Sequence, residues 1–252
     1  MNITIGHRKL NYQWINRTNH TERKPVIIFL HEGLGSIAQW KDFPALLCEK
    51  LDLQGLVYER EGYGLSSFWP DGIPNDYLLQ EGLEVLPELI SKLNIRQYYL
   101  FGHSDGATIA LFHATKPQTG LLAMAIEAPH VVIEKNTMKA LESAATLSSE
   151  FIMKLDKYQH GRASKLVGLW SNFWLNPERQ NWTMVDYLTS ISCPMILIQG
   201  DEDQFGSFLQ LDIIKEKTQS IIAELRLENC GHIPHLQYPK EVIDAVSHFF
   251  MK

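Results

Sequence analysis

One serine in this chain has the neighbours that a catalytic nucleophile needs. Ser104 is the middle residue of Gly102-His103-Ser104-Asp105-Gly106, a G-x-S-x-G sequence. Such a sequence is typical of a sharp strand-to-helix turn, because the two glycines remove side chains that would collide there. The turn exposes the serine hydroxyl, and the N-terminus of the following helix stabilises developing negative charge. We predict that Ser104 attacks a carbonyl carbon; the alternative is a glycine-rich turn without chemistry.

A serine nucleophile needs a base, and the base needs an acid that orients it. In a turn of this kind the expected chain order is serine, acid, histidine. The apolar run 195–198 is followed by three carboxylates, of which Asp203 has the expected G-x-x-D spacing, and we predict that it is the acid. Asp201 and Glu202 are interpreted as solvated loop charges. Glu127 is the other candidate acid, and its alternative role is that of a buried carboxylate bound to a backbone amide.

The predicted base is His232, which follows the apolar run 221–227 in the next loop and has Gly231 before it to give clearance. Histidine suits this role because its unperturbed pKa, near 6.5, lets it take and return a proton near neutral pH. His235 is the second candidate for the base. Its alternative role is to pack at the edge of the cleft or to face solvent. The histidines do not show the spacing of metal ligands within one element, so we expect no metal.

A glycine-rich stretch is suited to hold the oxyanion of the reaction. His31-Glu32-Gly33-Leu34-Gly35-Ser36 directly follows the apolar run 26–30. Backbone N–H groups aimed at the developing charge are worth several kcal/mol of barrier. We expect one donor to be the N–H of Asp105, next after the nucleophile. The other donor is the N–H of Gly33 or Leu34. The alternative is that this stretch is only a tight turn after a buried strand.

Short apolar runs alternate with longer amphipathic stretches, which indicates strand–helix–strand units and a mostly parallel sheet. The predicted strands are 3–5, 10–15, 26–30, 55–58, 98–101, 122–126, 195–198 and 221–227, the first two forming a hairpin. The predicted helices are 40–51, 77–93, 104–115 and 239–250. The sequence therefore predicts an α/β fold in which the candidate residues follow the carboxyl ends of strands.

The alternation breaks between residues 130 and 186, where no strand-like run occurs. We interpret 130–186 as a helical cap inserted into an α/β core formed by 1–129 and 187–252. Trp170 and Trp174 are four residues apart and share a helical face. Together with His130 they are candidate pocket residues; the alternative is that they only pack the cap onto the core.

Two arginines have two interpretations each, and a third has one. Arg162 and Arg179 have the chemistry to pair with a substrate carboxylate, but lone arginines in a cap are usually surface charges. Arg60, between Glu59 and Glu61, is expected to form structural ion pairs.

Composition excludes several classes of protein. The chain has 252 residues, of which 45% are hydrophobic and 21% charged, as in a soluble globular domain. The net charge of -6 and the absence of a basic run argue against nucleic-acid binding. The three separated cysteines and short apolar runs indicate a cytoplasmic protein without a signal peptide or membrane span. We expect a small-molecule substrate, no membrane partner and no cofactor.

The chain resembles the α/β-hydrolase superfamily over nearly its whole length. The resemblance rests on 31–36, the G-x-G-x-S turn 62–66, the G-x-S-x-G turn 102–106, 200–203 and 231–232. It implies about eight mostly parallel strands with a small helical cap after strand six, as in the branch of enol-lactonases, small-ester esterases and C–C-bond hydrolases. The chain departs from the family's usual pattern at Glu32, which replaces a small residue, and at Asp105, which replaces Met or Leu.

These features predict a serine hydrolase of small carboxylic esters or lactones that works through an acyl-enzyme. The alternatives are a C–C-bond hydrolase of vinylogous diketones, an acyltransferase and, in a different class, a non-enzymatic receptor for a small ligand.

Overall fold

The computed structural model describes residues 1–16, 24–145 and 148–252. An eight-stranded sheet runs through the molecule in the order β1-β2-β4-β3-β5-β6-β7-β8. The first two strands pair antiparallel with their neighbours, and all the later pairings are parallel. The strands are β1 (Asn2–Ile5), β2 (Arg8–Ile15), β3 (Val26–Leu30), β4 (Gln54–Tyr58), β5 (Tyr98–His103), β6 (Leu121–Glu127), β7 (Met195–Gly200) and β8 (Ile222–Leu227). The predicted α/β fold, with its N-terminal hairpin, is confirmed.

Three strands extend further toward the site than their apolar runs. β5 continues to His103, β6 ends at Glu127 and β7 continues to Gly200. Since parallel strands end at the same edge of a sheet, the polar residues that follow them are brought together. The strand ladder therefore places the candidate residues within reach of one another.

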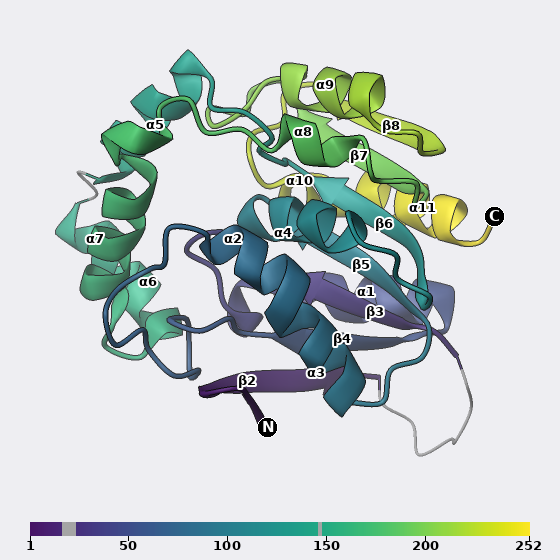
Figure 1. The fold of residues 1–252 in the computed structure, drawn as a ribbon, viewed down its shortest axis with the longest axis horizontal. Coiled ribbons are helices and arrows are strands. Elements are labelled where there is room, and N and C mark those ends of the chain that lie inside the picture. Colours follow the sequence, from purple (N-terminus) through teal and green to yellow (C-terminus); the bar gives the residue numbers. More distant parts are fainter. Residues whose placement is uncertain (17–23, 146–147) are drawn as a thin grey trace.

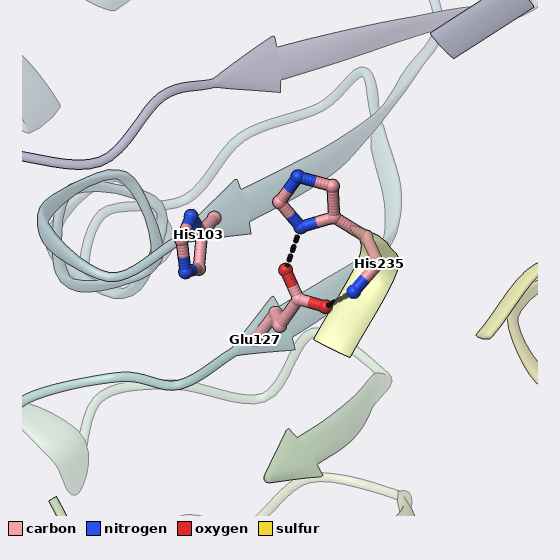
Figure 2. A group of neighbouring side chains, drawn as sticks. All are labelled: His103, Glu127 and His235. Atoms are coloured by element: carbon pink, nitrogen blue, oxygen red, sulfur yellow. Dashed lines mark hydrogen bonds and ion pairs between the residues drawn. The ribbon is translucent and has the colours of Figure 1, made fainter. Parts of the chain in front are cut away.

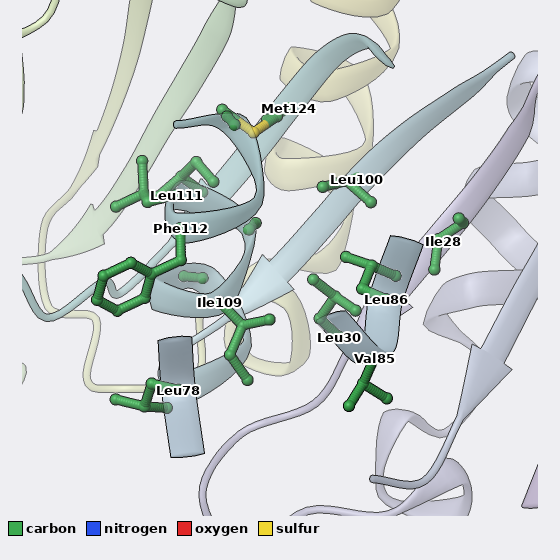
Figure 3. Packing of buried hydrophobic residues seen from close by; sticks show 14 of the residues in the cluster. Ile28, Leu30, Leu78, Val85, Leu86, Leu100, Ile109, Leu111, Phe112 and Met124 are labelled. Atoms are coloured by element: carbon green, nitrogen blue, oxygen red, sulfur yellow. The ribbon is translucent and has the colours of Figure 1, made fainter. Parts of the chain in front are cut away.

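Helices cover both faces of the sheet. On one face lie α2 (Tyr77–Gln80), the π-helical turn η2 (Glu81–Val85), α3 (Leu86–Lys92), α4 (Asp105–Ala114), α8 (Val185–Leu188) and α9 (Leu209–Lys217). Figure 3 shows part of this packing; Leu86 and Ile109 of the helices belong to the same buried cluster as Ile28 and Leu100 of the sheet. All ten residues of α4 are buried, so the helix that starts at the nucleophile is held on every side.

On the opposite face lie α1 (Phe43–Leu51) and α11 (Pro239–Phe250), which pack on the alternate residues of the same strands, such as Ile27 and Phe29. The helix that the sequence predicts from Trp40 begins only at Phe43. Residues Ile37–Trp40 form a separate 3-10 helix, η1, because the backbone of Lys41 turns into the left-handed region with φ +54°. The short helix α10 (Pro234–Gln237) precedes α11.

The segment between β6 and β7 supplies a third group of helices. They are α5 (Lys135–Ala145), α6 (Ser149–Gln159), α7 (Ala163–Trp174) and the 3-10 turn η3 (Pro177–Arg179). Figure 1 shows α5, α6 and α7 together at one side of the sheet, whereas α8 lies beside α9. The cap boundary expected between residues 186 and 187 therefore falls inside α8, a helix that packs with the core.

The sequence also predicts that the chain has no membrane-spanning segment and that its cysteines are reduced. Within the described residues, every helix is too short or too polar to cross a lipid bilayer. All three cysteines are free thiols.

Candidate functional site

The turn at Ser104 has the strained backbone that its sequence predicts. Ser104 lies between β5 and α4 with φ +54° and ψ -118°, a region that non-glycine residues rarely adopt. A Cβ at Gly102 would lie 2.5 Å from the Gly106 carbonyl oxygen, and a Cβ at Gly106 would collide with the carbonyl group of Leu30. The glycines are thus required by the close approach of the turn to its own helix and to β3.

The structure brings Ser104, His232 and Asp203 into one chain of hydrogen bonds. Ser104 Oγ lies 3.0 Å from His232 Nε2, and His232 Nδ1 lies 2.8 Å from Asp203 Oδ2. Because the Asp203 carboxylate accepts, His232 Nδ1 carries the proton and Nε2 is free to accept from the serine hydroxyl. This is the geometry of a nucleophile, a base and an orienting acid.

Asp203 is buried and held in its charged form. Burial alone would raise its pKa, but the facing His232 and the Phe205 N–H outweigh burial, and the pKa of Asp203 lies below its ordinary value. Gln199 Nε2 donates a further hydrogen bond to Oδ2 over 2.7 Å. The neighbouring Asp201 and Glu202 are exposed, as expected of loop charges.

A buried arginine supports the glycine-rich loop. Arg60 donates to the carbonyl oxygens of His31 and Glu32, over 2.5 and 2.9 Å, and to the Tyr77 hydroxyl. The expectation of ion pairs for Arg60 is wrong within the described residues, because its buried guanidinium binds these oxygens instead. Glu59 accepts from the Leu65 N–H, and Glu61 pairs with Arg8. Sequence adjacency to acids gave no signal of this role.

Gly33, Leu34 and Asp105, the three candidates for oxyanion donors, all line one cavity beside Ser104. Among the described residues no acceptor is found for their backbone N–H groups. These groups are therefore free to bind an oxygen in the cavity.

The two alternative candidates for acid and base pair with each other instead. Glu127 Oε1 accepts from the His235 backbone N–H at 2.7 Å, and Oε2 accepts from His235 Nδ1 at 2.5 Å. Figure 2 shows this pair with His103 on the other side of the carboxylate. Glu127 is thus the amide-bound buried carboxylate that was its alternative interpretation. His235 is buried rather than solvent-facing, because it packs on Trp40 and Phe43.

The ligating atoms of His103, Glu127 and His235 lie within 4.8 Å of one another, a distance that a metal ion could span. However, both oxygens of Glu127 and His235 Nδ1 are engaged with each other, and His103 Nε2 donates to the His232 carbonyl oxygen at 2.8 Å. We interpret this group as a hydrogen-bonded cluster that supports the base.

His103 also connects the cluster to the glycine-rich loop, a link that the sequence did not predict. Its Nδ1 lies 3.7 Å from Glu32 Oε2. Burial opposes a charge on His103, but Glu32 and Glu127 outweigh burial and raise its pKa to about 9. In return, His103 outweighs the burial of Glu32 and lowers the pKa of that carboxyl to about 2. The unusual carboxylate of Glu32 therefore has a cationic partner.

A cavity of about 630 Å³ opens over Ser104 and His232. Its walls come from the loops after the strands and from α5, α6 and α7, with Leu141, Phe151, Leu155 and Ile133 among the apolar residues. The candidate pocket residues Trp170, Trp174 and His130 all line it, and Trp174 also packs on Phe173 and Trp182. Trp174 therefore lines the cavity and also packs against other aromatic residues of the segment 130–186.

Arg162 and Arg179 do not line this cavity. Arg162 donates to the Ser66 carbonyl oxygen. Arg179 is buried against Phe173, with its guanidinium 3.6 Å from the ring centre, so it is not a surface charge. Neither is placed to pair with a carboxylate near Ser104.

The parallel sheet, the turn at Ser104 and the helices inserted after β6 define the architecture of an α/β-hydrolase. A sequence model of the alpha/beta hydrolase family matches residues 27–245, and the chain belongs to this family. The assignment drawn from the motifs is thereby confirmed.

Two curated relatives match parts of the chain. The 2-succinyl-6-hydroxy-2,4-cyclohexadiene-1-carboxylate synthase of Enterobacter sp. (strain 638) is 30% identical over 131 residues, 50% of this chain and 47% of that protein. A proline iminopeptidase of Lactobacillus delbrueckii subsp. lactis is 30% identical over 93 residues, 37% of this chain and 31% of that protein. The matches thus span about half or less of each relative's length.

Solved structures match over the whole chain. The enol-lactonase from Burkholderia xenovorans LB400 has a TM-score of 0.76 at 15% identity and covers 100% of both chains. The proline iminopeptidase of Mycobacterium smegmatis has a TM-score of 0.75 at 17% identity, covering 100% of this chain and 97% of the other. At these identities the likeness shows the fold.

Proposed function

We propose that this protein is a serine hydrolase that cleaves small, uncharged carboxylic esters or lactones through an acyl-enzyme. The observation that carries the proposal is the chain of hydrogen bonds from Ser104 through His232 to Asp203 at the wall of a largely apolar cavity. Membership in the alpha/beta hydrolase family supports it.

In the proposed reaction, Ser104 Oγ attacks the substrate carbonyl carbon while His232 Nε2 takes the hydroxyl proton. Asp203 holds the His232 Nδ1–H and stabilises the imidazolium that forms. His232 then gives the proton to the leaving oxygen, and the carbonyl re-forms as an ester of Ser104. Water attacks this ester with His232 again as base, which releases the acid and returns the proton to Ser104.

We assign the oxyanion to the N–H groups of Asp105 and Gly33. The C=O and N–H of one trans peptide point in opposite directions. The carbonyl of Glu32 belongs to the same peptide as the Gly33 N–H and is fixed by Arg60 at 2.9 Å and by His31 Nδ1 at 2.7 Å. The Gly33 N–H is thereby aimed away from Arg60 before substrate binds, which favours it over Leu34.

The charges of the cavity favour an uncharged substrate. Its described lining includes the carboxyl groups of Glu32 and Asp105 but no lysine or arginine. A dienoic substrate of a C–C-bond hydrolase, or any other carboxylate, would find no cation there and would face two acids. Ester or lactone hydrolysis is therefore favoured over C–C-bond cleavage, and acyl transfer or a receptor role is retained as an outcome of the test. A cytoplasmic setting stays a prediction.

The first experiment is mass spectrometry of the intact protein after treatment with a fluorophosphonate, together with hydrolysis of short p-nitrophenyl esters. We expect one adduct, on Ser104, and measurable turnover. Asp203→Asn should lower kcat/KM by about 10³–10⁴, because the imidazole loses its orienting acceptor.

Asp201→Asn is the matched control, since it changes an exposed carboxylate two residues away and should leave turnover near that of the wild type. Equal losses in the two variants would reassign the acid. If the protein forms no adduct and shows no turnover, the alternative of a non-enzymatic receptor for a small ligand is favoured.

A further inference from the structure

One histidine of the cavity wall, His130, has no part in the proposed reaction and is nevertheless held in a fixed position. Its backbone N–H donates to Thr108 Oγ1 at 3.2 Å, and its carbonyl oxygen accepts from the same hydroxyl at 2.8 Å. Its ring stacks on the ring of His232, with centroids 5.9 Å apart and planes at 26°, and meets the edge of Trp174 at 6.4 Å. The imidazole is therefore oriented before a substrate enters the cavity.

The two ring nitrogens of His130 have different surroundings. Nδ1 is buried without a hydrogen-bond partner among the described residues, and a Cβ at Gly206 would lie 3.6 Å from it, in ordinary van der Waals contact. In the same part of the chain the hydrogen bonds of His130 are those of its backbone, so Nε2 is also unpaired, but it is not one of the buried atoms. Because His130 lines the cavity, Nε2 is the nitrogen that a ligand can reach.

The open nitrogen of His130 is a neutral hydrogen-bond donor. Burial and, to a smaller extent, His232 lower the pKa of His130 to about 4, so the ring is uncharged at pH 7. A neutral imidazole has one N–H and one lone pair. A buried N–H without an acceptor is rare in folded proteins. The proton of this ring therefore belongs on Nε2, and the lone pair on the closed side at Nδ1.

The wall that follows His130 in the chain offers no competing group. Ile133 and Leu141 line the cavity with apolar side chains. Thr137, the polar residue of this stretch, donates to the Phe205 carbonyl oxygen and accepts from the Glu134 N–H. His130 is thus the side chain of this wall that still has a hydrogen bond to give.

The chemistry of the cavity selects the acceptor. A carboxylate would be repelled by Glu32 and Asp105, the two acids of the lining. An ammonium group has no lone pair to accept a hydrogen bond. A neutral oxygen, in a hydroxyl or an ether, accepts from Nε2 without either cost.

The stacked rings indicate which half of the substrate carries this oxygen. In the proposed reaction His232 gives its proton to the leaving oxygen, which therefore lies beside the His232 ring. His130 packs on that same ring. An O–C–C–O unit in the alcohol half is short enough to place its first oxygen at His232 and its second at His130.

We propose that His130 Nε2 donates a hydrogen bond to a neutral oxygen two carbons beyond the leaving oxygen, in the alcohol half of the ester. This inference rests on the proposed function, because it takes His232 to protonate the leaving oxygen. The substrate class is then a monoester of a 1,2-diol or of its monoether, or a lactone that carries a hydroxymethyl or alkoxymethyl group on the carbon next to the ring oxygen.

The test measures binding to the Ser104→Ala variant, so that it does not depend on turnover. The probes are 2-methoxyethyl acetate and butyl acetate, in which an ether oxygen replaces one CH2 group. A second pair, methyl 3-methoxypropanoate and methyl pentanoate, carries the same replacement in the acyl half. Dissociation constants come from ligand-observed NMR titration.

Replacing His130 locates the contact. His130→Phe keeps a ring to stack on His232 but has no N–H, and it should weaken 2-methoxyethyl acetate about tenfold relative to butyl acetate. The ratio within the acyl pair should stay within about twofold. His130→Gln restores a neutral N–H and should recover part of the preference. His160→Phe is the matched control, because this exposed histidine does not line the cavity over Ser104.

A second measurement does not need the His130 variants to fold. In the Ser104→Ala protein, the proton on His130 Nε2 is followed by ¹⁵N–¹H NMR of the histidine rings. We expect 2-methoxyethyl acetate to shift this signal downfield and butyl acetate to leave it near its ligand-free position.

Three results would overturn the proposal. Equal weakening of both acetates by His130→Phe, or an unshifted Nε2 signal, would mean that His130 does not contact the substrate oxygen. A His130-dependent ratio in the acyl pair instead would place the oxygen in the other half. An effect on 2-hydroxyethyl acetate against propyl acetate, with none on the ether, would make Nε2 an acceptor.

Failure of the proposed function is seen separately. If the protein with Ser104 intact turns over none of these esters while the binding preference is present, the hydrolase assignment fails and the His130 contact does not.

Discussion

Two groups of buried polar side chains lie near the nucleophile, and they differ in how many of their hydrogen bonds are made within the protein. In the inner cluster, His103, Glu127 and His235, the carboxylate is bound twice by one histidine and the other histidine holds the loop of the base. In the cavity cluster, Asp105, Trp170 and His130, each residue keeps one buried atom without a hydrogen-bond partner in the described structure. His103 Nδ1 of the inner cluster also makes no hydrogen bond there, but it faces the Glu32 carboxylate at 3.7 Å.

The difference separates support from recognition. A buried polar network that is satisfied within the protein fixes its neighbours and stabilises the fold. Buried polar atoms without partners destabilise the free protein, and a ligand that supplies the missing groups recovers that free energy on binding. The same residue types, a carboxylate and an imidazole, thus hold neighbouring segments together in the inner cluster and line the cavity in the other.

The largest expected effect breaks the inner cluster. Glu127→Leu leaves the His235 backbone N–H and Nδ1–H buried without acceptors, and the free energy of unfolding should fall by about 2–5 kcal/mol. Chemical denaturation followed by circular dichroism measures it. Glu228→Leu, at an exposed glutamate, is the control and should change stability by less than about 0.5 kcal/mol. A loss as small as that of the control would show that the inner cluster does not support the fold.

A smaller effect concerns the proton on His103. Its pKa is raised from 6.5 to about 9 in the folded protein. The stability that this proton contributes is therefore fully present below pH 6.5 and is lost as the pH rises through about 9. We expect the wild type to lose on the order of 1–3 kcal/mol more than His103→Gln between pH 6 and 9.5.

Urea denaturation of both proteins across this range measures the difference, and His248→Gln, at an exposed histidine of α11, should follow the wild type. Parallel curves for the wild type and His103→Gln would mean that Glu32 does not hold a proton on His103.

Local sequence was sufficient for the groups that directly follow strands. Ser104, Asp203 and His232 each come within a few residues of a strand's carboxyl end, so knowing the strand order is enough to bring them together. The helix from Trp40 was misplaced by three residues because a left-handed residue, Lys41, has no strong signature in sequence.

The remaining features of the site depend on how segments far apart in the sequence pack together. Arg60 stands between two acids in sequence, yet its guanidinium turns inward to carbonyl oxygens 28 and 29 residues away. The approach of Trp170 to Asp105 requires α7 to pack over the end of the sheet. No periodicity or motif in one chain specifies that packing. The sequence did identify Glu32 and Asp105 as departures from the family pattern, and both line the cavity.

The smallest expected effect has the opposite sign from that at Glu127. Asp105→Leu replaces a buried carboxyl group, whose burial outweighs its stabilising neighbours, by an apolar one, so the ligand-free protein should gain about 1 kcal/mol of stability. Burial raises the pKa of Asp105 from 3.8 to about 6, although Arg60, His232 and the Trp170 N–H act in the opposite direction. An acid with a raised pKa in the folded state weakens the fold as the pH rises from 3.8 to about 6, because the unfolded chain releases the proton first. The gain should therefore be larger at pH 7 than at pH 4, as measured by urea denaturation at both values. If Asp105→Leu instead destabilises the protein as Glu127→Leu does, Asp105 has a partner inside the protein, and the division between supporting and recognising clusters fails at this residue.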